Sequence, residues 1–331
     1  MSENESYDVV VVGGGAAGLS GAVALARSRR SVLVVDAGDP RNAPAGHVHN
    51  FLTRDGTPPA EIYATGRGEV ARYGGRVETG RVTALGKDGE RFLVQIGSRA
   101  VAARRLLIAT GLRDELPDVP GLAARWGIDV LHCAYCHGWE VAGQRIGVLA
   151  TGPMAIHQAL LFRQLSEHVT LLQHTGPAPA GEQREQLDAR GIAVAEGKVE
   201  RIDADARGLT GARLARGRRV ALDAVVVAPR MMARAELLAP LGLMPAEVRI
   251  GEHVAGTRIE ADRTRATAVP GVWVAGNIAD IQAQVITSAA AGLTAGAAIN
   301  LDLVLEETRN AAGARRHQRT GGEPAALLGR E

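Results

Sequence analysis

Residues 7–18 read YDVVVVGGGAAG, and this stretch decides the fold. Its first six residues form a continuous apolar and β-branched run, which is typical of a strand buried on both faces of a parallel sheet. Three glycines follow with the spacing Gly13-x-Gly15-x-x-Gly18, and an alanine-rich helical stretch begins behind them. A strand, a glycine-rich turn and a helix in this order predict the first unit of a dinucleotide-binding domain.

The next strand supports this interpretation. Residues 31–35 (SVLVV) predict a second strand that ends on Asp36, near the spacing at which a carboxylate reaches the ribose of a bound dinucleotide. The glycines allow the backbone to approach a pyrophosphate at the N-terminus of the helix. A glycine-rich turn with no ligand is the structural alternative.

Composition limits the class of protein. The chain has 331 residues, of which 46% are hydrophobic, so it is long enough for two domains with separate cores. A formal net charge of +2 provides no strong field for nucleic acid or a membrane surface. The first residues show no signal-peptide pattern, which favours a cytoplasmic protein. Residues 285–299 are rich in alanine and glycine and predict a packed helix rather than a membrane span.

The two cysteines of the chain, Cys133 and Cys136, lie in the sequence CAYC. Without an export signal, such a pair is more often catalytic or metal-binding than structural. A zinc site needs two more ligands, and His132 and His137 are too close in sequence to form a usual zinc finger. Redox chemistry is therefore favoured over a structural disulfide or a zinc site, and we expect no metal.

Two later segments carry a family resemblance. Residues 106–111 read LLIATG and residues 272–277 read VWVAGN, and each is a short apolar strand that ends in a turn of small residues. With the glycine-rich turn, they make roughly residues 7–305 resemble the thioredoxin-reductase-type flavoproteins. The resemblance implies an α/β fold with two nucleotide-binding, Rossmann-like domains, in which the FAD domain is discontinuous and an NAD(P)H-type domain carrying the cysteines is inserted into it.

The resemblance also implies domain bounds. The FAD domain would comprise residues 1–115 and 250–309, and the inserted domain residues 116–249. Residues 310–331 are poor in apolar residues and rich in glycine and arginine, and this composition predicts a mobile tail.

FAD is the cofactor that the resemblance implies. Asn277 stands where the family has an aspartate, and it can still bond a hydroxyl group of the ribityl chain without carrying charge. His47, in the loop expected beside the flavin, is a further candidate; an ordinary loop position is the alternative for it and for His49. The residues expected to bind FAD are Gly13, Gly15, Ala16, Ala17, Gly18, Asp36, Ala37, Arg41, His49, Asn50, Thr110, Gly111, Gly276, Asn277, Gln284 and Val285.

The inserted domain departs from the family pattern. Its first strand is followed by ATGPMA, so Ala150 replaces the first glycine of the G-x-G-x-x-A motif. Its second strand, residues 168–172, is followed by QHTGPAP, which has neither arginines for a 2′-phosphate nor an acid for a 2′-hydroxyl. We expect NAD(P)H recognition to be lost here. A nonstandard loop that still binds NAD(P)H is the alternative.

The redox motif indicates the subtype. By resemblance, Cys136 is the sulfur nearer the flavin and Cys133 exchanges with the substrate. His137 replaces the aspartate of thioredoxin reductases, and CxxCHG with an aromatic residue and Glu140 resembles the small-molecule dithiol oxidases of secondary metabolism that close holomycin- and gliotoxin-type disulfides. A histidine can take a proton from an incoming thiol. Glu140 either orients His137 or begins a helix, and Trp139 either packs or contacts substrate.

These observations predict an FAD-dependent dithiol oxidase whose catalytic residues are Cys133, Cys136, His137 and Glu140. Its partners would be a small-molecule dithiol and O₂, which is reduced to H₂O₂, with no nucleic acid and no membrane. The alternatives are a disulfide reductase fed by NAD(P)H or ferredoxin, and a flavin-binding redox sensor. A homodimer is expected by resemblance.

Overall fold

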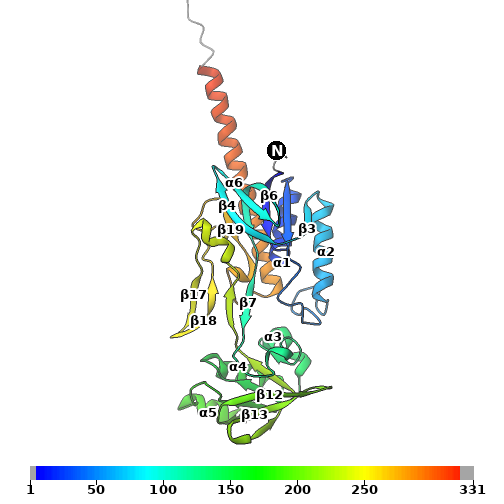
Figure 1. Cartoon of the computed structure of the whole chain (residues 1–331), viewed down its shortest axis with the longest axis vertical. Helices are drawn as coiled ribbons and strands as arrows, with labels where there is room; N and C mark the ends of the chain where they lie inside the picture. The colour runs from blue at the N-terminus through cyan, green and yellow to red at the C-terminus, as the bar shows by residue number, and fades with distance from the viewer. Residues whose placement is uncertain (1–4, 321–331) are drawn as a thin grey trace, which may run out of the picture.

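The computed structural model describes residues 5–320. Apolar β-branched runs form the sheet at the centre of its first lobe (Figure 1). The run after the N-terminus is the middle strand of a sheet in the order β3-β2-β1-β6-β5-β4, and β19 pairs in parallel with the end of β6. Its strands are β1 (Ser6–Val12), β2 (Val32–Asp36), β3 (Arg76–Thr79), β4 (Val82–Asp88), β5 (Arg91–Ile96), β6 (Arg99–Ile108) and β19 (Val272–Val274).

Two helices far apart in sequence pack on one face of this sheet. α1 (Ala16–Arg27) lies against α6 (Val285–Thr320), and a Cβ at Gly292 would come within 1.9 Å of the Ala17 carbonyl oxygen. α2 (Pro59–Arg72) packs beside α1. α6 is long and apolar enough to suit a membrane span, but its inner face, including Ile299 and Leu303, is fully buried in the core. It is packed as the helix predicted from the sequence.

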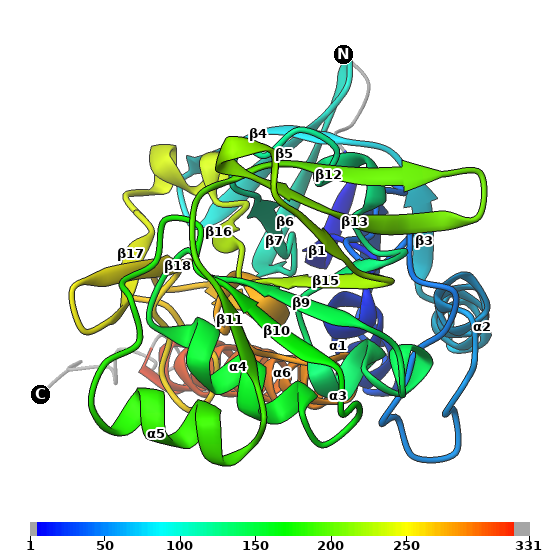
Figure 2. The same cartoon turned by 90° about the horizontal axis from the view of Figure 1, so that it is seen from below.

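The second lobe is built on a parallel sheet in the order β11-β10-β9-β15-β8. Figure 2 shows helices α4 and α5 on one side of this sheet and the antiparallel strands β12 and β13 on the other. The elements are β8 (Val130–Leu131), α3 (Ala134–His137), β9 (Ile146–Leu149), α4 (Met154–Phe162), β10 (Val169–Leu172), α5 (Glu182–Ala189), β11 (Ala193–Ala195), β12 (Val199–Asp205), β13 (Gly208–Leu214), β14 (Arg219–Ala221) and β15 (Ala224–Val227).

A four-stranded sheet in the order β17-β18-β16-β7 joins the lobes. It contains β7 (Leu112–Glu115), β16 (Arg230–Ala233), β17 (Ala246–Ile250) and β18 (His253–Arg258). Residues 230–249 were assigned to the inserted domain from the sequence. The structure pairs them with β7 and β18 and buries Leu238 in the core of the first lobe, so the second lobe ends before β16. No signal in the sequence marks this domain boundary, because β16 follows β15 with almost no linker.

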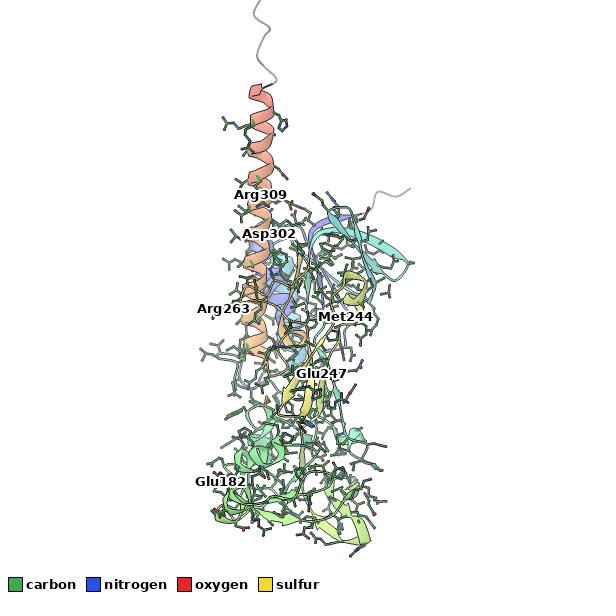
Figure 3. The ribbon with its side chains drawn as sticks, turned by 90° about the vertical axis from the view of Figure 1, so that its left-hand side faces the viewer. Glu182, Met244, Glu247, Arg263, Asp302 and Arg309 are labelled. Carbon is green, nitrogen blue, oxygen red and sulfur yellow. A yellow bond between two sulfur atoms is a disulfide. The ribbon has the colours of Figure 1, made fainter. Side chains whose placement is uncertain are left out.

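The C-terminal segment also differs from expectation. The tail assigned to residues 310–331 does not begin as a separate element, because α6 continues without a break to Thr320 and extends beyond the first lobe (Figures 1 and 3). Ion pairs from Arg104 and Arg105 of β6 to Glu306 tie the helix to the sheet just before this extension. Alanine and arginine are strong helix formers and favour its continuation. Residues 321–331 lie outside the described part of the chain.

Candidate active site

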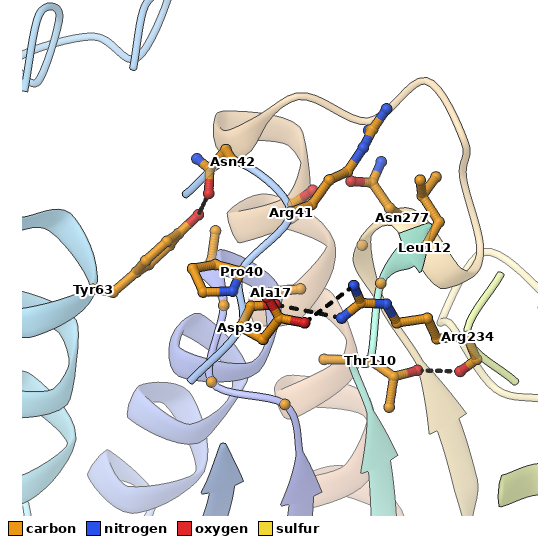
Figure 4. Close-up of a pocket in the computed structure, with 18 of the residues that line it drawn as sticks. Ala17, Asp39, Pro40, Arg41, Asn42, Tyr63, Thr110, Leu112, Arg234 and Asn277 are labelled. Atoms are coloured by element: carbon orange, nitrogen blue, oxygen red, sulfur yellow. Dashed lines mark hydrogen bonds and ion pairs between the residues drawn. The ribbon is translucent and has the colours of Figure 1, made fainter. Parts of the chain in front are cut away.

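A cavity of about 1160 Å³ runs from the glycine-rich turn after β1 to the two cysteines on the second lobe. The parallel strands of the first lobe end at its floor, which is where α/β sheets bind their ligands. Figure 4 shows side chains from distant parts of the chain around this cavity, with Ala17 beside Asp39 and Pro40, and with Asn277 from the C-terminal part.

The glycine-rich turn has the shape that a dinucleotide requires. A Cβ at Gly18 would come within 1.9 Å of the Gly13 carbonyl oxygen, so Gly18 allows α1 to pack against the turn. A Cβ at Gly15 would meet no protein atom within 4 Å, and Gly15 lines the cavity. No side chain caps the N-terminus of α1. Open space and uncapped backbone amides therefore meet at a helix N-terminus, which suits a pyrophosphate.

All residues expected to bind FAD line the cavity except Gly18 and Asn50. Gly18 lies beneath the turn, in the packing role described above. Asn50 instead donates its side-chain amide to the carbonyl oxygen of Tyr135 on α3. The structure therefore places the Asn50 amide at the junction between the lobes, outside the lining of the cavity.

Asn277 has a different hydrogen-bonding role from the one expected. Its Nδ2 group donates to the carbonyl oxygens of Asp280 (3.0 Å) and Ala283 (2.9 Å), which fixes the loop that leads into α6. Its carbonyl oxygen is then the side-chain atom that can accept from a ligand hydroxyl. An aspartate could not donate to these two carbonyls, which gives a physical reason for asparagine here.

Several cavity residues were not found from the sequence. Arg41 was predicted, but not its bidentate ion pair with Asp114, at 2.6 and 2.7 Å. Arg234 approaches Asp39 at 3.5 Å, and its carbonyl oxygen accepts from Thr110 (Figure 4). These pairings join β7 and β16 to the loop after β2, and they depend on a sheet that no local pattern predicts. Other lining residues outside the predicted set include Asn42, Tyr63, Trp126 and Ser288.

The redox pair sits at the start of a short helix. Cys133 and Cys136 form a disulfide, and both residues line the cavity. Cys133 caps α3, because its Sγ accepts from the Cys136 N–H at 3.2 Å and its carbonyl oxygen accepts from the His137 N–H at 3.1 Å. The disulfide thus lies where the second lobe faces the first.

Two histidines beside the pair have lowered pKa values. Burial is the main cause for His137, whose pKa is also lowered by His49 and His47 and raised by Glu140. Burial, followed by the nearby charge of Arg41, lowers the pKa of His132 to about 4. Both imidazoles are therefore mainly neutral near pH 7, and a neutral imidazole can accept a proton.

Glu140 contacts a different histidine from His137, the partner considered from the sequence. Its Oε1 lies 3.0 Å from Nε2 of His49, so the histidine that it orients directly is His49 rather than His137. Its influence on His137 is electrostatic, through the raising effect on the pKa. Glu140 lies in the short 3-10 helix Trp139–Val141, so it also stands at a helix start.

Trp139 does not pack in the core. It is 79% exposed, Tyr135 on α3 is 65% exposed, and Leu52 on the facing loop is 81% exposed. Of the two interpretations of Trp139, packing in the core is the one that this exposure contradicts. Trp139 and Tyr135 are thus exposed apolar side chains within three residues of a cysteine, and such side chains beside a reactive group are typical of a binding surface.

Comparisons with known proteins identify the family. The family model described as pyridine nucleotide-disulphide oxidoreductase matches residues 7–296. The chain belongs to this family. The thioredoxin reductase sirT of Leptosphaeria maculans is 30% identical over 89% of this chain and 93% of its own length. The thioredoxin reductase tcpT of Claviceps purpurea is 39% identical over 55% of this chain, and the match spans only 60% of tcpT. The solved structure of HlmI is 44% identical, with a TM-score of 0.86, over 96% of this chain and 98% of HlmI.

Thioredoxin-reductase-like members of this family bind FAD. The described residues fit that cofactor: the turn with the open Gly15 suits its pyrophosphate, and Asp36 lies at the end of β2 where a ribose is bound. The predicted fold class and cofactor are thereby confirmed.

The second lobe of this oxidoreductase has the strand order of a nucleotide-binding domain, and its loops after β9 and β10 contact each other. Gly176, in the segment after β10, donates its N–H to the carbonyl oxygen of Ala150 at 2.8 Å. His174 accepts from the Val199 N–H at 3.1 Å through its Nδ1, so its ring is used within the lobe. The ring of His253, which belongs to β18, lies against Gly152, where a Cβ would be 2.9 Å from it.

Proposed function

We propose that this chain oxidises a small-molecule dithiol to its disulfide through Cys133 and Cys136, with O₂ as the electron acceptor. The observation that carries the proposal is the contrast between the two lobes. The cysteines face an open cavity that suits FAD, whereas the second lobe has Ala150 in place of the first motif glycine and neither an arginine nor an acid in residues 173–179 to recognise NAD(P)H. The match to HlmI supports the same reading.

The proposed exchange moves two electrons from the substrate thiols to the Cys133–Cys136 disulfide. His137 takes the proton of one substrate thiol, and the resulting thiolate attacks Sγ of Cys133, which breaks the Cys133–Cys136 bond and releases Cys136 as a thiolate. The second substrate thiol attacks the substrate sulfur of this mixed disulfide and breaks its bond to Cys133, and its proton passes to the departing Cys133 sulfur. The substrate leaves as a disulfide, oxidised by two electrons, and the two cysteines are reduced by two. FAD held in the cavity would supply the two-electron chemistry that restores the disulfide, with O₂ and two protons giving H₂O₂.

His137 suits the role of proton acceptor in this exchange. It is half-buried, it lines the cavity with both cysteines, and its lowered pKa keeps the imidazole neutral at neutral pH. Once protonated, the imidazolium is favoured by Glu140, which raises the pKa of His137. A general base needs these two properties together: a free lone pair before the step and a compensating charge after it.

The test is to mix the purified, FAD-loaded protein without oxygen with NADPH, with NADH or with dithiothreitol. Dithiothreitol should bleach the flavin rapidly and either nicotinamide slowly, and admitting O₂ should restore the colour with H₂O₂ formed. The Cys133→Ser/Cys136→Ser double variant is the control, which should bind FAD but not bleach with dithiothreitol. Rapid bleaching by NADPH would instead make the chain a disulfide reductase, the activity in the names of its fungal relatives.

We further propose that the protein acts as a cytoplasmic homodimer. The outward side of α6 carries exposed Leu293, Leu301, Val304 and Leu305, an apolar face that a second copy would cover. Sedimentation velocity should show a dimer, and Leu301→Lys/Leu305→Lys should shift it toward monomer. A monomeric parent protein at micromolar concentration would contradict this assignment.

A further inference from the structure

The loop at residues 47–56 of the first lobe reaches across to the redox helix of the second. His49 Nε2 lies 3.0 Å from Glu140 Oε1, and the side-chain amide of Asn50 donates to the carbonyl oxygen of Tyr135. Tyr135 lies between the two cysteines, and Glu140 lies four residues beyond Cys136. The first lobe therefore contacts both α3, at Tyr135, and the 3-10 helix that follows it, at Glu140.

The loop is built to hold these two side chains in place. The Asp55 carboxylate accepts from the Asn50 N–H at 2.8 Å and lies 3.4 Å from His49 Nδ1. Val48 is buried and pairs with Thr57, which closes the base of the loop. Asn50 has φ +58°, a left-handed conformation that asparagine tolerates better than most residues. The side chains of His49 and Asn50 therefore extend from a backbone that these contacts hold in place.

The redox helix needs such support. α3 has four residues, and so short a helix does not persist in water without tertiary contacts. The second lobe is joined to the first by two chain crossings, one after β7 and one before β16, as Figure 1 shows for β7. Two crossings allow pivoting, which would carry the cysteines away from the cavity. Close contacts of Pro44 with Gly127 and of His253 with Gly152 oppose the same motion.

We propose that loop 47–56 is an interlobe clamp, in which His49 and Asn50 are positioning residues that hold the redox helix against the cavity. They act through Glu140 and through the Tyr135 carbonyl. The inference concerns where α3 is held, so it is independent of whether a dithiol or a nicotinamide supplies the electrons.

The test compares Asn50→Asp with the parent protein, both full-length and FAD-loaded. Aspartate keeps the size of asparagine and its tolerance of positive φ, but it cannot donate to the Tyr135 carbonyl. Loss of one such bond should speed hydrogen exchange of the amides of residues 134–138 about 3- to 10-fold. A His49→Ala/Asn50→Asp double variant should exchange faster still, and His49→Gln, which retains a donor toward Glu140, should exchange more slowly than His49→Ala.

Two comparisons make the test decisive. Arg54→Ala, in the same loop but with no described side-chain contact to α3, should leave exchange at residues 134–138 unchanged. Strand β9 should exchange at the parental rate in every variant, and exchange rates are compared at equal FAD occupancy. Without oxygen, dithiothreitol should reduce the flavin of the double variant more slowly at saturation, with unchanged concentration dependence. Faster exchange confined to residues 47–56, or spread over the whole second lobe, would overturn the clamp.

Discussion

Alanine substitutions at two glycines of the same turn should have opposite consequences. At Gly15 a Cβ would meet no protein atom within 4 Å, and the backbone has φ −79°, which any residue can adopt. Gly15→Ala should therefore fold normally and lose affinity for FAD. At Gly18 a Cβ would stand 1.9 Å from the Gly13 carbonyl oxygen. Gly18→Ala should therefore damage the fold itself.

The size of each effect follows from the geometry. A methyl group at Gly15 would push a phosphate out by about 1.5 Å, the length of the added bond. Losing one or two charge-assisted hydrogen bonds at about 1.5–3 kcal/mol each costs roughly 2–5 kcal/mol. This corresponds to a dissociation constant about 30- to 4,000-fold higher. Gly18→Ala requires α1 to move by about 1 Å, and such overpacking costs about 1–3 kcal/mol of unfolding free energy.

The assay measures two quantities on each variant: flavin absorbance per mole of purified protein, and the thermal midpoint of FAD-free protein. Gly15→Ala should be nearly colourless with a parental FAD-free midpoint, and excess FAD should raise that midpoint less than it does for the parent. Gly18→Ala should lower the FAD-free midpoint. Parental FAD affinity in Gly15→Ala would refute the placement of the pyrophosphate at this turn.

Three further outcomes are expected. His137→Ala should lower dithiol turnover by about 10²- to 10⁴-fold. The parental rate should fall as pH drops through the lowered pKa of His137, where the base becomes protonated. An unchanged rate in His137→Ala would exclude His137 as the general base. Trp139→Ala should raise KM for an aromatic dithiol several-fold but not for dithiothreitol; equal effects on both would exclude a role in selectivity. The pairs of Glu307 with Arg30 and Arg104 lower the Glu307 pKa to about 2, so their stabilisation is full above about pH 4.5 and lost as pH falls toward 2. Because Glu307 is partly exposed, Glu307→Gln should cost about 0.5–1 kcal/mol in urea unfolding at pH 7 and little at pH 2, and an equal cost at both would refute this linkage.

The first lobe was predictable because its signals are local. The strand, the glycine-rich turn and Asp36 lie within thirty residues, and each has a defined physical task. The junction was not predictable, because its pairings join segments far apart in sequence. Arg41 meets Asp114, and His49 meets Glu140, only after β7 and the second lobe have been placed. No periodicity or motif in a single sequence encodes such contacts.

The retention of a nucleotide-binding fold in the second lobe has a structural explanation that does not require a nucleotide. The redox segment runs from β8 to β9, and both strands pair with β15, which lies between them in that sheet. On α4, the buried Gln158 donates to the carbonyl oxygen of His132 at 3.0 Å, directly before Cys133. The sheet and α4 thus fix one side of the redox segment, and the clamp at residues 47–56 fixes the other. A lobe freed from binding NAD(P)H would still be required as the scaffold that presents the disulfide to the cavity.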